Sequence, residues 1–177
     1  MRIISGTHKG RRLIAPRNLP VRPTTDFAKE ALFNILRNDY IFEEISLLDL
    51  FAGTGNISYE FASRGTQDII AVDAHYACVK YIQKTSEELD FSIKTVKSDV
   101  FKFLSAITTK FDIIFADPPY KFDNQEFESF IGKIFQNNLI NPNGLVIIEH
   151  SKHTDLSNFP HFKESRKYGG SVFSFFQ

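Results

Sequence analysis

The chain has 177 residues, 42% of them hydrophobic and 24% charged, which is enough for one domain with an ordinary core. A single cysteine, Cys78, excludes an internal disulfide, and the cysteine and histidine positions give no zinc-site spacing, so we expect no metal. No apolar run reaches membrane-spanning length and the N-terminus lacks a signal peptide pattern, so we expect a cytoplasmic protein without membrane contact.

The net charge of zero hides an uneven distribution. Residues 1–25 carry six basic and no acidic side chains, whereas the rest of the chain carries 15 basic and 21 acidic ones. A basic segment on an acidic body is typical of an arm that binds a polyanion such as a nucleic acid. A solvated basic edge without a partner is the alternative that this pattern leaves open.

The first 25 residues predict a small hairpin followed by a connector. Residues 2–4 and 12–14 flank a turn, residues 6–10, that has a glycine at each end where the backbone must bend. Three prolines within residues 16–23 then favour an extended connector.

A helix is expected to follow the connector. Thr25 and Asp26 are favourable N-cap residues, so the helix should begin there. Its apolar positions recur at helical spacing and predict one buried face: Phe27, Ala28, Ala31, Leu32, Ile35 and Leu36.

From residue 46 onward, apolar strands alternate with amphipathic helices. The expected strands are residues 46–51, 68–72, 92–96, 111–116 and 144–149, and the expected helices are residues 56–63, 76–89, 100–107 and 125–137. This alternation predicts a mostly parallel sheet covered by helices on both faces. A closing antiparallel hairpin, residues 162–167 and 171–176, completes seven strands. We therefore expect an α/β, Rossmann-like domain: residues 1–25 as arm and connector, residues 26–177 as core.

Residues 49–56 lead from a strand through two glycines into a helix, a pattern in which the backbone can approach a ligand closely. Ser58 stands where a pyrophosphate-binding loop has its third glycine. S-adenosylmethionine, which joins adenosine to an amino acid without phosphate, fits this loop. The predicted contacts are Asp49, Phe51, Ala52, Gly53, Gly55 and Asn56.

The next two strands each end in an acidic residue. Asp73, followed by Ala74, lies 18 residues after Gly55, where a carboxylate can accept hydrogen bonds from both ribose hydroxyls. Asp99, followed by Val100, can accept from the adenine amino group. Each aspartate also has a simpler interpretation as the N-cap of the helix that follows.

The segment Asp117-Pro118-Pro119-Tyr120 follows a buried apolar strand. The prolines stiffen the chain, so this segment is held at the edge where open α/β sheets bind ligands. We expect all four residues to form a catalytic site for an exocyclic amine: the Asp117 carboxylate and the Pro118 carbonyl accept from the amine, and Tyr120 stacks on the base. Asp117 also lies close enough to contribute to the cofactor site. His75, His150 and His153 are weaker candidates.

Two motifs resemble class I S-adenosylmethionine-dependent methyltransferases that act on amino groups: the glycine loop, residues 49–55, and the 117–120 segment. The N-terminus is similar to the bacterial RsmD family, through Met1-Arg2-Ile3-Ile4-Ser5-Gly6, Lys9-Gly10-Arg11, Arg22-Pro23-Thr24-Thr25-Asp26 and Lys29-Glu30-Ala31-Leu32-Phe33-Asn34, as is Tyr168-Gly169-Gly170. The chain departs from the family at Phe27 and Lys29, where arginines are frequent.

The resemblance implies methylation of N2 of a guanine in 16S ribosomal RNA, guanine 966, within a 30S or pre-30S particle, by a monomer. Phosphate contacts would then come from basic side chains at the N-terminus. We assign them to Arg2, Lys9, Arg11, Arg12, Arg22 and Lys29. Two alternatives are an adenine-N6 DNA methyltransferase, which shares the 117–120 motif, and a non-catalytic RNA-binding protein with the same fold.

Overall fold

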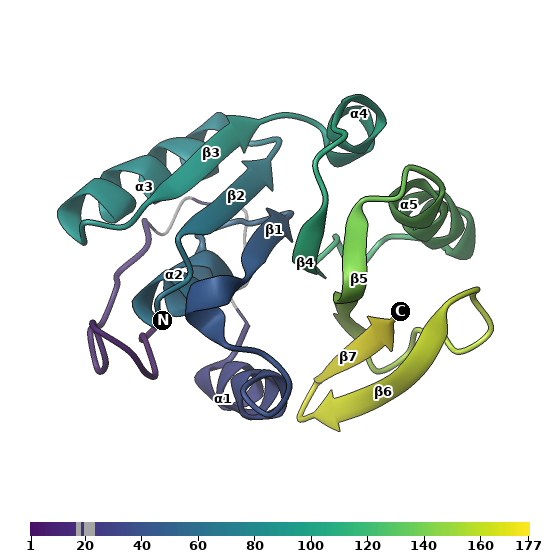
Figure 1. The fold of residues 1–177 in the computed structure, drawn as a ribbon, viewed down its shortest axis with the longest axis horizontal. Coiled ribbons are helices and arrows are strands. Elements are labelled where there is room, and N and C mark those ends of the chain that lie inside the picture. Colours follow the sequence, from purple (N-terminus) through teal and green to yellow (C-terminus); the bar gives the residue numbers. More distant parts are fainter. Residues whose placement is uncertain (17–18, 20–23) are drawn as a thin grey trace.

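The structure is a computed structural model that describes residues 1–16, 19 and 24–177. A seven-stranded sheet with the order β3-β2-β1-β4-β5-β7-β6 runs through its centre (Figure 1). The strands are β1 (Ser46–Leu50), β2 (Asp68–Asp73), β3 (Ile93–Lys97), β4 (Phe111–Ala116), β5 (Ile140–Ser151), β6 (Phe162–Tyr168) and β7 (Ser171–Phe176). Strands β1 to β5 pair in parallel, and β7 pairs antiparallel with both β5 and β6. The predicted fold class is confirmed.

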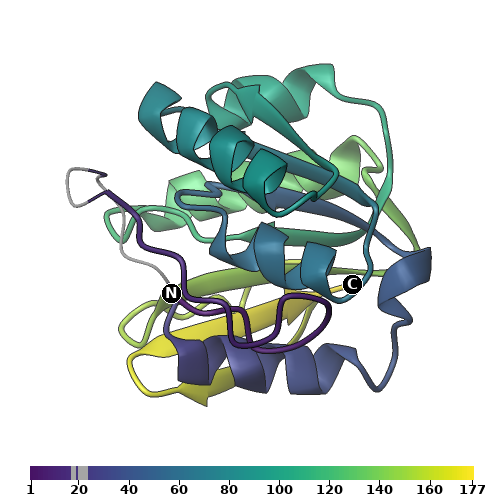
Figure 2. The same ribbon diagram turned by 90° about the vertical axis from the view of Figure 1, so that its left-hand side faces the viewer.

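The described part of the chain has five α-helices and one 3-10 turn, Phe42–Glu44. The first helix and this turn precede β1, and each of the other four helices connects two parallel strands. The helices are α1 (Asp26–Leu36), α2 (Asn56–Ser63), α3 (Tyr76–Glu88), α4 (Val100–Ala106) and α5 (Asn124–Gln136). Helices α1, α2 and α3 cover one face of the sheet and α4 and α5 cover the other, as Figures 1 and 2 show. Most predicted boundaries agree within one or two residues. Strand β5 is the exception, because it begins at Ile140 rather than Gly144.

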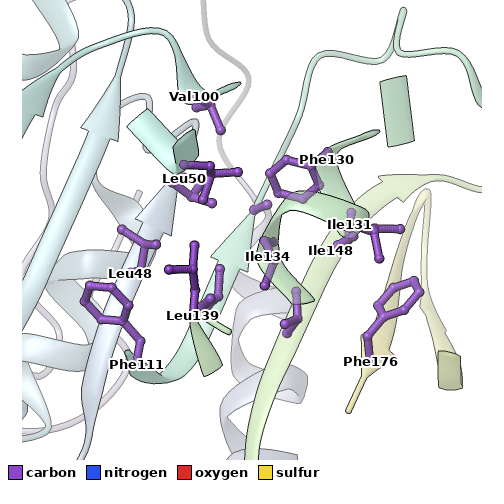
Figure 3. Packing of buried hydrophobic residues seen from close by; sticks show 14 of the residues in the cluster. Leu48, Leu50, Val100, Phe111, Phe130, Ile131, Ile134, Leu139, Ile148 and Phe176 are labelled. Atoms are coloured by element: carbon purple, nitrogen blue, oxygen red, sulfur yellow. The ribbon is translucent and has the colours of Figure 1, made fainter. Parts of the chain in front are cut away.

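The sheet is buried on both sides because successive residues of the central strands point to opposite faces. Leu48 and Leu50 of β1 belong to one buried cluster with Phe130 and Ile134 of α5, which Figure 3 shows from close by. Leu47, from the same strand, joins the cluster under α1 and α2 on the other face. Each such side chain contributes about 1.5–3 kcal/mol through removal of its apolar surface from water.

The strand register brings several strand ends to one edge of the sheet. Leu50 of β1 lies opposite both Val72 and Ala116, and Ala116 lies opposite Ile148 of β5. The carboxyl ends of the parallel strands therefore coincide. Because Ser171 pairs with Ser151, the turn between β6 and β7 lies at the same edge.

The N-terminal segment agrees with the prediction in outline only. A single antiparallel bridge joins Arg2 and Arg12, and the Ile3 N–H donates to the Arg11 carbonyl at 3.0 Å. The predicted hairpin is thus present, but its two sides are too short to form strands. Instead of pairing further, this arm docks on α2 through Glu60, which accepts from the Ile4 N–H at 2.7 Å.

Helix α1 begins as predicted, and Ala28, Leu32 and Leu36 of the predicted apolar face are buried, but the face differs at Phe27. Thr25 is the N-cap, and its hydroxyl accepts from the Ala28 N–H at 3.2 Å. The prediction that Phe27 is buried is wrong, since its side chain is 66% exposed. Phe33 and Lys29 are buried in its place. Phe33 is buried because its ring packs against those of Phe42 and Phe61, which lie outside the helix.

Candidate active site

A cavity of about 500 Å³ lies at the carboxyl ends of the parallel strands, a size typical of small-molecule sites. The 117–120 segment forms one side of it and the glycine loop forms another. Its walls include these predicted residues: Asp49, Phe51, Ala52, Gly53, Asn56, Asp73, Ala74, Asp99, Val100, Asp117, Pro118, Pro119 and Tyr120. Of the predicted cofactor residues, only Gly55 does not line the cavity.

The glycine loop is held in its bent form by Asp73. Gly53 has φ +54°, and its N–H donates to Asp73 Oδ2 at 2.8 Å. The other oxygen of Asp73 accepts from the His75 N–H, also at 2.8 Å. Each carboxylate oxygen has two acceptor sites, so Asp73 keeps acceptor capacity toward the cavity. Gly55 shapes the turn: at φ +77° it precedes α2, and a Cβ atom there would lie 2.9 Å from the Tyr59 ring.

Asp49 and Asp99 both line the cavity but differ in environment. Asp49 is buried and accepts from the Ser58 N–H at 3.2 Å and the Ser58 hydroxyl at 2.5 Å. Burial raises the pKa of Asp49 to about 7, against the effect of these two hydrogen bonds. Asp99 is exposed and caps α4 by accepting from the Lys102 N–H at 3.0 Å. Its capping role is therefore established, and its contact with a cofactor stays a prediction.

Asp117 continues β4 into the cavity, and Glu149 stands beside it. The Asp117 N–H donates to the Leu50 carbonyl at 3.3 Å, which ties the segment to β1. Because Ala116 pairs with Ile148, Asp117 and Glu149 are the next residues in the parallel register of β4 and β5. Burial, followed by the charges of Glu149 and Asp49, raises the pKa of Asp117 well above its usual range. Asp117 can therefore bind a proton at a higher pH than an ordinary aspartate does.

Glu149 was not predicted as a site residue. It is buried and accepts from the Thr24 hydroxyl at 2.5 Å, and Thr24 itself lines the cavity. Burial raises the pKa of Glu149, so a second carboxyl group with high proton affinity lies behind Asp117. The signal in the sequence was an acidic residue at the end of an otherwise apolar strand, the same signal that identified Asp73.

Three phenylalanines of the cavity wall were also missed, namely Phe101, Phe115 and Phe122. The rings of Phe101 and Phe122 stack with their centroids 6.0 Å apart, and Phe51 meets Phe122 edge to face at 5.5 Å. Phe101 directly follows the predicted site residues Asp99 and Val100 at the start of α4, and this position was the signal for it. The abundance of phenylalanine, 19 residues, concealed this signal because most of these rings belong to the core.

The charge of the cavity is one-sided. Its walls carry five carboxyl groups and the imidazole of His75, and no lysine or arginine of the described chain lines it. The five are Asp49, Asp73, Asp99, Asp117 and Glu126. Such walls favour a cationic ligand and repel a polyphosphate.

The chain matches known proteins over its whole length. The model of a family described as "Conserved hypothetical protein 95" matches residues 1–177. Ribosomal RNA small subunit methyltransferase D of Haemophilus influenzae is 31% identical over 157 residues, which cover 86% of this chain and 79% of the relative. The chain belongs to the RsmD family.

Solved structures share the fold of this RsmD family member. A hypothetical protein of Thermus thermophilus, TTHA0928, has a TM-score of 0.86 and 27% identity, with 100% of this chain and 99% of that chain covered. The 16S rRNA N2 G1207 methyltransferase RsmC of T. thermophilus, solved with AdoMet and guanosine, has a TM-score of 0.71 and 21% identity, with 90% and 45% covered. At that identity, the second comparison supports the class I methyltransferase fold alone.

The structure divides the predicted RNA-binding residues into three groups. Arg2, Lys9, Arg11 and Arg12 are exposed on the arm, where they can reach a phosphate. Arg22 lies outside the described residues. Lys29, one of the two departures from the RsmD pattern, has no exposed side-chain surface. The prediction of a phosphate contact by Lys29 is therefore wrong.

Lys29 instead joins the arm to the glycine loop. Its ammonium donates to the Arg2 carbonyl at 2.7 Å and to Asn56 Oδ1 at 2.8 Å, and lies 3.3 Å from Glu60 Oε2. Asn56 in turn donates to the Thr24 carbonyl at 3.0 Å. Burial lowers the pKa of Lys29, while the charge of Glu60 opposes that shift. One buried cation thus fixes the arm, α1 and the start of α2.

The remaining candidates lie away from the cavity. His150 is buried, and its Nε2 is 2.8 Å from the Ser174 hydroxyl, whereas His153 is exposed; neither lines the cavity. Cys78 is buried in the core, as predicted. In the described part of the chain, no group of three acidic, histidine or cysteine side chains is placed to hold a metal ion. None of its helices is long and apolar enough to cross a membrane.

Proposed function

We propose that this protein is an S-adenosylmethionine-dependent methyltransferase that modifies N2 of a guanine in 16S ribosomal RNA, guanine 966 by family resemblance. The observation that carries the proposal is the meeting of two motifs in one cavity: the acid-flanked glycine loop and the 117–120 segment. The first suits a cofactor and the second suits an amine. The compartment we infer is the cytoplasm.

The cavity walls fit S-adenosylmethionine. The sulfonium and the amino group are cationic, and the carboxyl groups of the walls complement both. Asp73 would hold the ribose, Asp99 the adenine amino group, and Phe51, Phe101 and Phe122 would pack against the flat adenine ring. The lack of a lysine or arginine along the described walls disfavours a nucleotide cofactor with a phosphate chain.

The bound cofactor supplies a methyl group on a cationic sulfur, which departs as a neutral thioether. Asp117 and the Pro118 carbonyl accept hydrogen bonds from the exocyclic amine and direct its lone pair toward the methyl carbon. Tyr120 and the prolines hold the base in place and exclude water. Once the C–N bond has formed, the nitrogen is positively charged, and Asp117 takes its proton or passes it to water. The raised pKa of Asp117 suits this late proton transfer.

The substrate class follows from the arm and the relatives. Arg2, Lys9, Arg11 and Arg12 supply positive charge for a phosphate backbone, which positions RNA without reading its sequence. The relative from Haemophilus influenzae bears the name of a small-subunit ribosomal RNA methyltransferase. A paired guanine has to leave its helix to reach the cavity, so an unpaired or flipped base is the substrate.

To test this, the protein is incubated with labelled S-adenosylmethionine and one of three substrates: 30S particles from a deletion strain, duplex DNA, or an oligoribonucleotide in which inosine replaces the target guanine. We expect label in the 30S particles alone, because inosine lacks the N2 amine. Label in DNA adenine would establish the alternative DNA enzyme. Asp117→Ala should abolish methyl transfer. Asp68→Asn is the control and should not, because Asp68 is exposed and lies at the amino ends of the strands, away from the cavity.

A further inference from the structure

A pair of aromatic side chains, the exposed Phe27 and the half-buried Tyr168, lies outside the cavity and has no role in the site described above. Phe27 on the first turn of α1 is 66% exposed. Its ring meets that of Tyr168, at the end of β6, edge to face with centroids 6.2 Å apart. Tyr168 also packs against the buried Phe173 at 6.0 Å. Tyr168 is therefore anchored in the fold, and Phe27 rests on it with most of its surface in solvent.

The pair lies at the edge of the sheet that holds the cavity. Tyr168 pairs with Ser171, which pairs with Ser151 at the carboxyl end of β5, so the β6–β7 turn lies at the sheet edge that holds the cavity. Figures 1 and 2 show this turn beside α1. Thr24, which lines the cavity, precedes Phe27 by three residues. Tyr168 therefore lies at the same edge of the sheet as the cavity, and Phe27 closely follows a residue that lines it.

A basic side chain, Arg2, is held against the same turn of α1 by the carboxylate of Asp26. The Arg2 N–H donates to Asp26 Oδ1 at 3.3 Å, and Arg2 Nε lies 3.5 Å from Asp26 Oδ2, on the same first turn of α1. The Arg2 side chain keeps 47% of its surface exposed, and a guanidinium has five N–H donors, so it can bind a phosphate as well. A ring beside a basic side chain is the usual arrangement for binding single-stranded nucleic acid.

We propose that Phe27, braced by Tyr168, stacks on an unpaired nucleobase that neighbours the target guanine, while Arg2 binds the adjoining phosphate. This inference rests on the proposed function, since a target base that enters the cavity leaves its neighbour without a stacking partner. The ring of Phe27 replaces that partner. An exposed face of this kind tolerates any base, so the contact adds affinity and no sequence preference.

The test compares three variants on 30S particles and on a 16S oligoribonucleotide that spans the target. Phe27→Ala should raise KM and weaken binding of the oligoribonucleotide by about 5- to 150-fold, the usual range for loss of one stacked base, with kcat unchanged. Phe27→Tyr should restore binding. Ile41→Ala is the matched control: Ile41 is 60% exposed but lies before the amino end of β1, at the other edge of the sheet, and its loss should change neither constant.

An abasic nucleotide beside the target guanine separates stacking from folding. It should weaken binding to the wild-type protein but not to Phe27→Ala, because the stacking contact is already lost. The inference is overturned if Phe27→Ala binds and methylates like the wild type, or if the abasic site weakens both proteins equally. Failure of the wild type to methylate any RNA would instead contradict the proposed function, so the two failures are distinguishable.

Discussion

Replacing Lys29 by methionine is expected to lower the free energy of unfolding by about 3 kcal/mol, near the lower end of the cost of breaking a buried ion pair. Lys29 and Glu60 have no exposed side-chain surface. Without the ammonium, the Arg2 carbonyl and Asn56 Oδ1 each lose a buried donor. Glu60 keeps its contact with Arg64 at 2.9 Å and the N–H groups of two arm residues, which limits the loss.

Glu60→Gln should cost more, about 5 kcal/mol, because it leaves the Lys29 ammonium buried without a counter-charge. Urea denaturation measures both values, and the melting temperature of Lys29→Met should fall by roughly 6–12 °C. Lys84→Met is the matched control, since Lys84 is 76% exposed and its contact with Glu88 at 3.7 Å is a surface pair that contributes little.

The Lys29→Met variant also distinguishes a buried structural role of Lys29 from a role in RNA binding. Arg12→Ala should reduce the slope of RNA affinity against salt by about one unit, and Lys29→Met should leave that slope unchanged. The reasoning is refuted if Lys29→Met unfolds like Lys84→Met, or if it flattens the salt dependence as a phosphate contact would.

Three further predictions concern the cavity and the arm. Asp73→Ala should weaken S-adenosylmethionine binding by about 10- to 150-fold in calorimetry, since a charged hydrogen bond contributes roughly 1.5–3 kcal/mol; unchanged affinity would remove Asp73 from the site. Because burial raises the folded-state pKa of Asp49 from 3.8 to about 7, the folded state binds more protons between these values, and the contribution of Asp49 to the unfolding free energy should fall as the pH rises from about 4 to about 7. Asp49→Asn should show a shallower fall in urea titrations at each pH; an equal slope would contradict the shift. Gly6→Ala should destabilise the protein in thermal unfolding far more than Gly10→Ala: both have positive φ, but only at Gly6 would the Cβ collide with the Ser63 carbonyl. Equal losses would show that the arm does not dock on α2.

The sequence predicted the sheet and most of the cavity because both depend on local patterns. Continuous apolar strands, the glycine loop and the 117–120 segment each occupy a few consecutive residues. The register of parallel strands then brings their ends together without further information. This is why Asp49, Asp73 and Asp117 line the same cavity as expected.

The errors arose where a residue's environment depends on distant partners. Helical periodicity predicted Phe27 as buried and basic charge predicted Lys29 as exposed, and the structure reverses both. Glu60, 31 residues after Lys29, provides the counter-charge that permits its burial. Phe101 and Phe122 were missed for a different reason: a phenylalanine in a cavity wall and one in the core look alike in a sequence.

The central claim is that the cavity transfers a methyl group to a guanine amine, and nucleotide-resolved mass spectrometry tests it most directly. Small-subunit RNA from a deletion strain would be compared after complementation with the wild-type protein and with Asp117→Ala. The proposal predicts one N2-methylguanosine that is restored by the wild type and absent with Asp117→Ala. No change in any guanine, or equal restoration by Asp117→Ala, would contradict it.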